Sequence, residues 1–324
     1  MTIRKAVSAA LAVVLAGAFA SAAVAKGKPA DTPGKGKAAK AATVFTLTPS
    51  THGNPEGVAW DPATRSFFVG ATGDGTIYRG TTDNPTVGEF ITGAAGKSAV
   101  GMKVSHGKLY VAGGGTGAIT VYDIATKAVV ASFSTGAGGF LNDLVVTGHG
   151  DVYVTDSFRS TLWHVTRAQV KAGSGAPETI SVAPEITYDT TPNTFNLNGI
   201  VARDNAKRLI VVQTNTGKLF RIDVRRNGGR RITQITADPL VGGDGLLLSN
   251  GRLVVVRGNP ASLTFLKLKR NATRAKVEAV RTDPTLKGPS TVARARNLFL
   301  VVNADFATST QPFTVSGLPR KGDH

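Results

Sequence analysis

Six residues stand at the same place in six similar segments of the sequence: Glu56, Val100, Asn142, Asn198, Asp244 and Ser290. Four of them carry a side-chain carboxylate or amide. Two carboxylates brought into a desolvated space repel each other and lose hydration unless a positive charge lies among them. A bound cation would supply that charge. If the fold gathers these side chains, their types predict a metal site.

The predicted ligands are oxygen donors, without histidine or cysteine. Such donors suit a hard cation, Ca²⁺ or Mg²⁺, better than zinc or copper. Glu56 and Asp244 supply a formal charge of −2, which matches one divalent ion, and the two asparagines supply carbonyl oxygens. We expect Ca²⁺, because it tolerates more varied coordination. The alternative is that Asn-Asp, Asn-Gly and Asp-Gly are ordinary turn dipeptides that precede strands.

The segments that carry these residues share one pattern. A small or polar residue precedes an apolar strand, a turn rich in Gly, Asn or Asp, and a second apolar strand. Successive segments start 44, 42, 56, 46 and 46 residues apart. They are EGVAWDPATRSFFVGAT from Glu56, VGMKVSHGKLYVAGG from Val100, NDLVVTGHGDVYVTDS from Asn142, NGIVARDNAKRLIVVQT from Asn198, DGLLLSNGRLVVVRG from Asp244 and STVARARNLFLVVNAD from Ser290.

Further strands follow each segment. The third strands of the first five are TIYRG, AITVYDI, TLWHVT, KLFRID and LTFLKL, and a polar-apolar fourth segment follows most of them. Four strands in a repeat of about 45 residues are typical of a β-propeller blade, whose first strand lines the central tunnel. We therefore predict an all-β fold, a six-bladed β-propeller with four-stranded blades over residues 43–324.

The closure of this ring depends on the N-terminal strand. The sixth segment, from Ser290, has no clear fourth strand, whereas residues 43–49 (TVFTLTP) precede the first segment without a partner. We predict that residues 43–49 complete the last blade, which leaves no open sheet edge there. The alternative is an open β-solenoid.

The N-terminal region predicts a secreted protein. Two basic residues precede an uncharged apolar run over residues 6–20, and small residues end at Ala25. This is the pattern of a signal peptide over residues 1–25, cleaved near Ala25, and the run is short for a membrane span. Residues 26–42, rich in Lys, Gly, Pro and Ala, predict a disordered linker.

Composition limits the remaining possibilities. Cysteine is absent, which excludes a disulfide scaffold, a thiolate metal site and a cysteine nucleophile. The formal net charge is +17, and basic residues cluster around two turns, at 225–231 and 267–276. Such basic loops can give weak binding to an anionic surface, although a solvated face is the simpler interpretation. No motif predicts a specific nucleic acid partner.

The blade starts also carry a family resemblance. The segments PEGVAWDP, LNDLVVTGHGDVYVTDS, LNGIVARDNAKRLIVVQT and GDGLLLSNGRLVVV resemble the senescence marker protein (regucalcin)/gluconolactonase/luciferin-regenerating enzyme family, over about residues 55–300. The resemblance implies a six-bladed propeller with Ca²⁺ or another divalent ion in its tunnel and hydrolysis of lactones or related esters. It implies Asp244 as the catalytic residue. The implied metal ligands are Glu56, Asn142, Asn198 and Asp244.

The sequence departs from the family near the expected tunnel mouth. Sugar lactonases of the family tend to carry an Arg shortly before the third-blade Asn, whereas Phe140 and Leu141 precede Asn142 here. Phe140 indicates a less polar small-molecule substrate, no substrate, or a packing role. His52, just before the first blade, is a second candidate to reach the substrate pocket.

Two functions follow from the sequence. The first is a secreted Ca²⁺-dependent hydrolase of lactones or related esters, in which the ion polarises a substrate oxygen and Asp244 acts as general base or nucleophile. The second is a non-catalytic propeller that binds a partner or an anionic surface through its basic loops, with a structural metal ion. One fold can serve either function.

Overall fold

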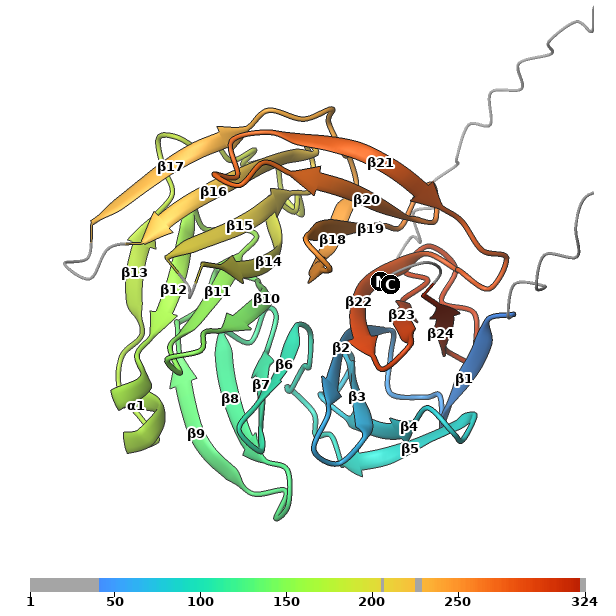
Figure 1. Cartoon of the computed structure of the whole chain (residues 1–324). Coiled ribbons are helices and arrows are strands. Elements are labelled where there is room, and N and C mark those ends of the chain that lie inside the picture. Colours follow the sequence, from blue (N-terminus) through green and yellow to red (C-terminus); the bar gives the residue numbers. More distant parts are fainter. Residues whose placement is uncertain (1–40, 205–206, 225–228, 321–324) are drawn as a thin grey trace, which may run out of the picture. The chain divides into compact units, whose positions relative to one another are not determined.

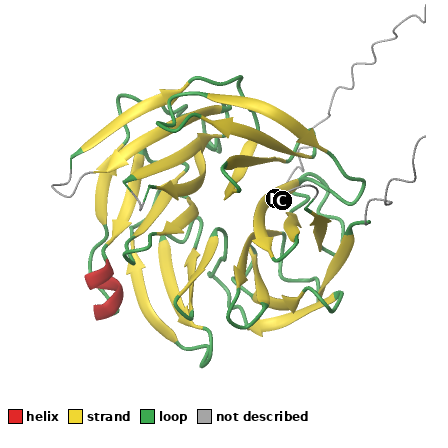
Figure 2. Ribbon diagram, viewed as in Figure 1, coloured by secondary structure: helices red, strands yellow, loops and turns green. Residues whose placement is uncertain are grey.

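The computed structural model describes residues 41–204, 207–224 and 229–320. The expected signal peptide and residues 26–40 of the expected linker lie outside these residues. The described residues form 24 strands and one short helix, α1 (Arg167–Ala172), which confirms the all-β fold class (Figure 2). Within them, no helix combines the length and the apolar character that crossing a membrane requires.

Most strands form antiparallel groups of four that follow chain order (Figure 1). Four such groups are separate sheets among the described residues. One contains β6 (Met102–Ser105), β7 (Lys108–Ala112), β8 (Ala118–Asp123) and β9 (Val129–Ser134). The next contains β10 (Leu141–Val146), β11 (Val152–Asp156), β12 (Thr161–Val165) and β13 (Glu178–Ser181). The other two contain β14 (Leu197–Arg203), β15 (Arg208–Gln213), β16 (Lys218–Val224) and β17 (Arg230–Ile235), and β18 (Gly243–Ser249), β19 (Arg252–Arg257), β20 (Ser262–Leu268) and β21 (Ala275–Arg281).

The remaining sheet has eight strands in the order β2-β3-β4-β5-β1-β24-β23-β22. Its strands are β1 (Thr43–Thr48), β2 (Pro55–Asp61), β3 (Ser66–Ala71), β4 (Ile77–Thr81), β5 (Thr86–Ile91), β22 (Pro289–Ala295), β23 (Leu298–Asn303) and β24 (Thr314–Pro319). The N-terminal strand β1 pairs antiparallel with β24, as predicted. It also pairs in parallel with β5, which was not predicted and joins the first and last groups in one sheet.

The first strands of the groups contact one another in a closed order. Strand β2 contacts β6, and the same contact continues through β10, β14 and β18 to β22, which returns to β2. Apolar side chains fill the space between neighbouring groups, as where Phe45 of β1 packs on Phe67 of β3 with ring centroids 5.3 Å apart. Strand β3 is therefore buried along its whole length. Strand β9, farther out, alternates buried and exposed residues near its end, as a half-buried strand should.

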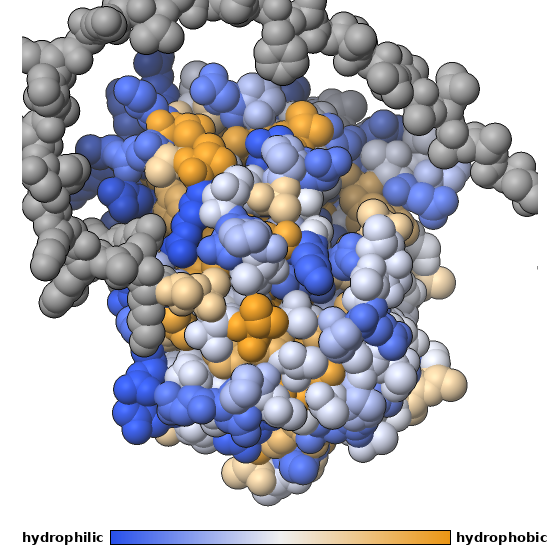
Figure 3. Space-filling model, turned by 90° about the vertical axis from the view of Figure 1, so that its right-hand side faces the viewer, coloured by the Kyte–Doolittle hydropathy of each residue, from blue (hydrophilic) through white to orange (hydrophobic). Residues whose placement is uncertain are grey.

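One face of the molecule is mixed in polarity. In the view of Figure 3, hydrophobic residues form separate patches among hydrophilic ones. Isolated apolar residues on a surface are normal and need no partner.

Five of the six first strands have an irregular pairing close to their start. The register shifts after Pro55 in β2, after Leu141 in β10 and at the matching points of β14, β18 and β22. A β-bulge of this kind re-aims a side chain and is common beside functional sites. The residues within these bulges include five of the six predicted ring positions, namely Glu56, Asn142, Asn198, Asp244 and Ser290.

The glycines that follow ring positions have a packing role. A Cβ on Gly57 would lie 2.0 Å from the backbone oxygen of Val100, and a Cβ on Gly199 would lie 2.3 Å from the backbone oxygen of Asp244. Glycine is needed where two backbones approach this closely. The Asn-Asp, Asn-Gly and Asp-Gly pairs lie inside strands β10, β14 and β18, so they are not the turn dipeptides of the alternative interpretation.

Candidate functional site

A cavity of about 480 Å³ lies where the first strands begin. A volume of this size suits a small molecule. Residues from several groups of strands line it: Glu56, Thr72, Val100, Phe140, Asn142, Phe195, Asn198, Thr214, Asp244 and Phe306. The structure thus brings together all four predicted ligand residues, which are far apart in the sequence, and places Phe140, a predicted pocket residue, beside them. Of the other ring positions, Val100 lines the cavity, while Ser290 is buried and donates a hydrogen bond of 2.8 Å to the backbone oxygen of Glu56.

The two carboxyl groups of the cavity are poorly solvated. Burial raises the pKa of Glu56 well above its ordinary range, and the nearby carboxylates of Asp244 and Asp143 raise it further. Burial, with a contribution from Asp143, raises the pKa of Asp244 to about 8, against the opposing effect of a side-chain hydrogen bond from Asn198. Negative charge is therefore costly in this cavity until a positive group balances it.

Three buried side-chain oxygens of the cavity have no hydrogen-bond partner within the described part of the chain: Asn142 Oδ1, Asn198 Oδ1 and Asp244 Oδ1. The amide nitrogen of Asn142 is engaged, because it donates to Ser157 Oγ at 3.1 Å. The Ser157 hydroxyl in turn donates to the backbone oxygen of Leu197 at 2.6 Å. An unpartnered buried polar atom costs roughly 1–3 kcal/mol, and three oxygens of this kind on one cavity are donors that a bound cation would satisfy.

Asp143 is a charged neighbour of the cavity that the sequence reasoning missed. Its Oδ1 lies 3.0 Å from Lys103 Nζ and accepts the backbone N–H of Leu144 at 2.8 Å. Its Oδ2 accepts the backbone N–H of Ile200 at 3.3 Å. These partners already satisfy the carboxylate, so Asp143 links β6, β10 and β14 and is not a free ligand. The signal for it was the Asn-Asp pair, because Gly follows the ring position in most other segments.

The residues at the cavity fit a hard divalent cation. Their donors are two carboxylates and two amide oxygens, a set that Ca²⁺ accepts with water or substrate in its remaining positions. In the described ranges, no group of three or more His, Cys, Asp or Glu is placed to hold a metal. Two of the four donors at this cavity are asparagines, which do not belong to those four residue types.

His52 is not among the residues that line the cavity, contrary to the prediction. Its Nδ1 is 2.7 Å from Asp74 Oδ2, and its Nε2 is 2.8 Å from Glu89 Oε1. The hydrogen bond with Asp74 is the main cause of a raised pKa at His52, with Glu89 adding to it. Two carboxylates therefore hold the imidazole of His52 in place. The ring centroids of His52 and Tyr78 lie 6.0 Å apart.

Comparison with solved structures identifies the fold as a β-propeller. The gluconolactonase XC5397 from Xanthomonas campestris superposes with a TM-score of 0.61 at 17% identity, over 86% of this chain and 89% of that one. A calcium-binding regucalcin from Agrobacterium tumefaciens gives 0.60 at 15% identity, over 83% and 91%. The WD40 β-propeller domain of Doa1 gives 0.51 at 12% identity, over 83% and 80%. No protein-family model and no curated protein matches the sequence.

Proposed function

We propose that this chain is a divalent-metal-dependent hydrolase of lactones or related esters, with Ca²⁺ as the preferred ion. The observation that carries the proposal is the convergence of two carboxyl groups and two amides on one cavity, with three buried oxygens left unpartnered. Two neighbours of similar fold support it, since one is described as a gluconolactonase and the other as a calcium-binding regucalcin.

The proposal includes a six-bladed propeller of the regucalcin and gluconolactonase type. In this interpretation the eight-stranded sheet comprises two blades, β2 to β5 and β22 to β24 with β1, joined by the short parallel pairing of β1 with β5. Four separate sheets of the described residues supply the other blades. The closed order of contacts among the six first strands supports this interpretation.

A bound divalent ion would polarise the carbonyl oxygen of the substrate. Glu56, Asn142 and Asn198 would hold that ion. Asp244, whose Oδ1 has no other partner, would accept a proton from water as the water oxygen bonds to the carbonyl carbon. The ring C–O bond then breaks, and Asp244 returns the proton to the leaving oxygen. In the alternative, Asp244 itself attacks the carbonyl carbon and water hydrolyses the resulting acyl group.

Metal analysis combined with turnover tests this function. We expect one calcium ion per chain and hydrolysis within a panel of lactones and esters. EDTA should abolish turnover, and added Ca²⁺ should restore it. Asp244→Asn should lose hydrolysis while the ion stays bound, and full activity of this variant would refute the catalytic role. A bound ion without turnover of any compound in the panel would favour a non-catalytic propeller.

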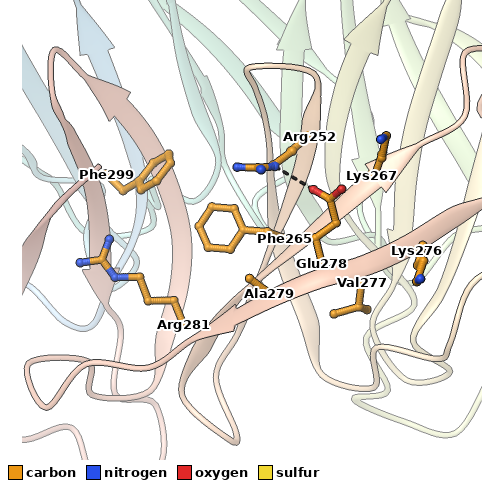
Figure 4. A pocket seen from close by; sticks show the side chains of 9 residues that line it. All are labelled: Arg252, Phe265, Lys267, Lys276, Val277, Glu278, Ala279, Arg281 and Phe299. Atoms are coloured by element: carbon orange, nitrogen blue, oxygen red, sulfur yellow. Dashed lines mark hydrogen bonds and ion pairs between the residues drawn. The ribbon is translucent and has the colours of Figure 1, made fainter. Parts of the chain in front are cut away.

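A basic groove supports that second candidate function, the binding of an anionic polymer. The groove holds about 590 Å³ and lies over β20 and β21 beside Phe299 of β23 (Figure 4). Its basic residues are Arg252, Lys267, Lys276 and Arg281. Glu278 is its one acidic lining residue and pairs with Arg252 at 2.8 Å. In Figure 4, Lys267 and Lys276 lie on the right-hand side of the groove, and Arg281 and Phe299 lie on its left.

The basic surface extends beyond the groove. Neighbouring hollows are lined by Lys269, Arg270 and Arg274, which belong to the basic turn predicted at 267–276. Clustered positive charge of this kind attracts polyanions in a salt-dependent way. On a heparin column, the double variant Lys267→Glu with Lys276→Glu should elute at clearly lower salt than the wild type. The decrease in elution salt for each lysine replaced should be larger than in the control Lys97→Glu. An equal loss per charge would show that net charge alone acts.

We also propose that the protein is secreted after cleavage near Ala25. The proposal rests on the residue pattern of positions 1–25. N-terminal sequencing of the protein recovered from a culture medium should begin at Lys26. A cell-associated product that retains residue 1 would contradict it.

A further inference from the structure

Four phenylalanines gather beside the cavity, and we call them the aromatic collar: Phe140, Phe158, Phe195 and Phe306. Three of them line the cavity, and Phe158 packs against Phe140 and Phe195 with ring centroids 5.6 and 5.2 Å away. The rings of Phe140 and Phe195 lie edge to face at 5.0 Å. Phe158, Phe195 and Phe306 are 38, 37 and 57% exposed. Exposed aromatic rings that cluster in this way mark a binding surface.

A buried network centred on Asp156 holds part of the collar in place. The Asp156 carboxylate is fully buried and accepts the backbone N–H groups of Phe140 at 2.9 Å and Phe158 at 3.1 Å. It also accepts Arg159 Nε at 2.7 Å and Trp163 Nε1 at 3.1 Å. Burial alone would raise the pKa of Asp156, but these hydrogen bonds hold it below its usual range. The two loops that carry Phe140 and Phe158 are therefore fixed before any ligand binds, which lowers the entropy cost of binding.

The loop before β14 is held in the same manner. Asn196, next to Phe195, is buried, and its Nδ2 donates to the backbone oxygens of Ser157 at 3.2 Å and Asp189 at 2.9 Å. These bonds connect the loop of Phe195 to the residue that precedes Phe158. The collar is thus a preorganised surface made by separate loops.

The polar groups of the cavity exclude two substrate classes. None of its lining residues is Lys, Arg or His, so an anionic substrate would find no cationic side chain there, and the two carboxylates already balance the charge of the proposed ion. Apart from the four ligand residues, the polar lining side chains are Thr72 and Thr214. Their hydroxyls donate to the backbone oxygens of Asn54 at 2.9 Å and Gly243 at 2.8 Å. Both hydroxyl protons are therefore already engaged, so a polyhydroxylated sugar would find few side-chain partners here and would lose more hydrogen bonds to water than it regains.

We infer that the cavity takes a neutral lactone or ester that carries an apolar chain, with the carbonyl at the four oxygen donors and the chain against the aromatic collar. This inference rests on the proposed hydrolase function and names its substrate class. Each methylene that the collar covers should raise kcat/KM about three- to fourfold, as burial of a methylene does elsewhere.

A series of γ-lactones from γ-butyrolactone to γ-undecalactone tests the inference, with glucono-δ-lactone as the sugar representative. For the calcium-loaded protein, kcat/KM should rise with chain length until the collar is covered, and glucono-δ-lactone should be a poor substrate. Phe306→Ala should lower kcat/KM for γ-undecalactone at least tenfold more than it lowers kcat/KM for γ-butyrolactone, which has no chain to place against the collar. Val280→Ala, at a 58% exposed residue of β21, is the matched control and should change neither. A flat series, or a preference for the sugar lactone, would overturn the inference.

A binding measurement separates failure of this inference from failure of the hydrolase proposal. The probe is 2-heptylcyclopentanone, a neutral ketone that cannot be hydrolysed. If it binds, and Phe306→Ala weakens binding at least fivefold while no lactone is turned over, the inference stands and the hydrolase proposal falls. If lactones are turned over but kcat/KM does not change with chain length, the hydrolase proposal stands and the inference falls. Aromatic rings beside carboxylates also suit an organic cation, so tighter binding of tetraethylammonium than of the ketone would overturn the neutral class.

Discussion

Replacing Asp244 with Asn should stabilise the metal-free protein. The Asp244 side chain is half-buried close to Glu56 and Asp143, and its Oδ1 is buried without a hydrogen-bond partner in the described part of the chain. Asparagine keeps the shape of the side chain and removes the ionisable group. The substitution therefore removes a group that the metal-free fold accommodates at neutral pH only by keeping it protonated, and it also removes a ligand that would be charged when the metal is bound.

The sign and the size follow from the pKa. Asp244 titrates at about 8 in the folded protein, against 3.8 for an ordinary Asp, so the folded state keeps a proton that the unfolded chain has released at pH 7. Its contribution to the free energy of unfolding is most favourable below about pH 4 and is lost as the pH rises to about 8. At pH 7, about three units above the ordinary pKa, this loss of stability would reach roughly 4 kcal/mol as an upper bound. Water entry and local relaxation reduce the loss below that bound. We expect a gain of about 1–3 kcal/mol and a Tm rise of about 2–8 °C at pH 7.

Thermal unfolding in EDTA between pH 5 and 9 measures this effect. The wild-type Tm should fall with rising pH more steeply than the Tm of Asp244→Asn, and calcium should raise the Tm of the variant less. Asp123→Asn is a control of opposite sign, because hydrogen bonds with Thr126 lower the pKa of Asp123. A variant less stable than wild type in EDTA at pH 8, or one with an undiminished calcium shift, would refute the reasoning.

Three further predictions concern the ion, the close backbone approach and β1. Calcium binding should release protons, and its affinity should rise from pH 6 to pH 8, because both cavity carboxyl groups must ionise to bind the ion. Calorimetry in two buffers of different ionisation enthalpy measures the number of protons released. An affinity that does not change with pH would contradict this prediction. Gly199→Ala should lower the free energy of unfolding in urea by more than about 2 kcal/mol, since its Cβ would meet a backbone oxygen at 2.3 Å, while Gly88→Ala in open space should be nearly neutral. Phe45→Ala removes a fully buried ring of β1 and should lower the free energy of unfolding by about 3–5 kcal/mol. Deletion of residues 43–49 should lower the Tm sharply. Unchanged stability of either variant would show that β1 does not close the sheet.

The sequence was informative where structure is local. Strands β2, β10, β14, β18 and β22 each begin one residue before the predicted ring position, because the same short pattern of polar start, apolar strand and turn governs each of them. Strand β6 begins at Met102, two residues after Val100, since the backbone before it bonds to neighbouring segments instead. The convergence of the four oxygen donors followed from this repeat alone.

Features that depend on distant contacts were not predictable. The parallel pairing of β1 with β5 arises when the ring closes, and no local pattern announces it. His52 was expected at the cavity because of its position in the chain, but its ring turns to Asp74 and Glu89. The aromatic collar comes from separate loops without periodic spacing, so of its members the sequence indicated Phe140 alone.

The central claim is that one divalent ion binds among four side chains gathered from four groups of strands. A crystal structure of the mature protein grown with calcium tests it most directly. The account predicts one ion with oxygens of Glu56, Asn142, Asn198 and Asp244 at about 2.3–2.6 Å. A cavity without an ion at saturating calcium, or an ion bound only elsewhere, would contradict it.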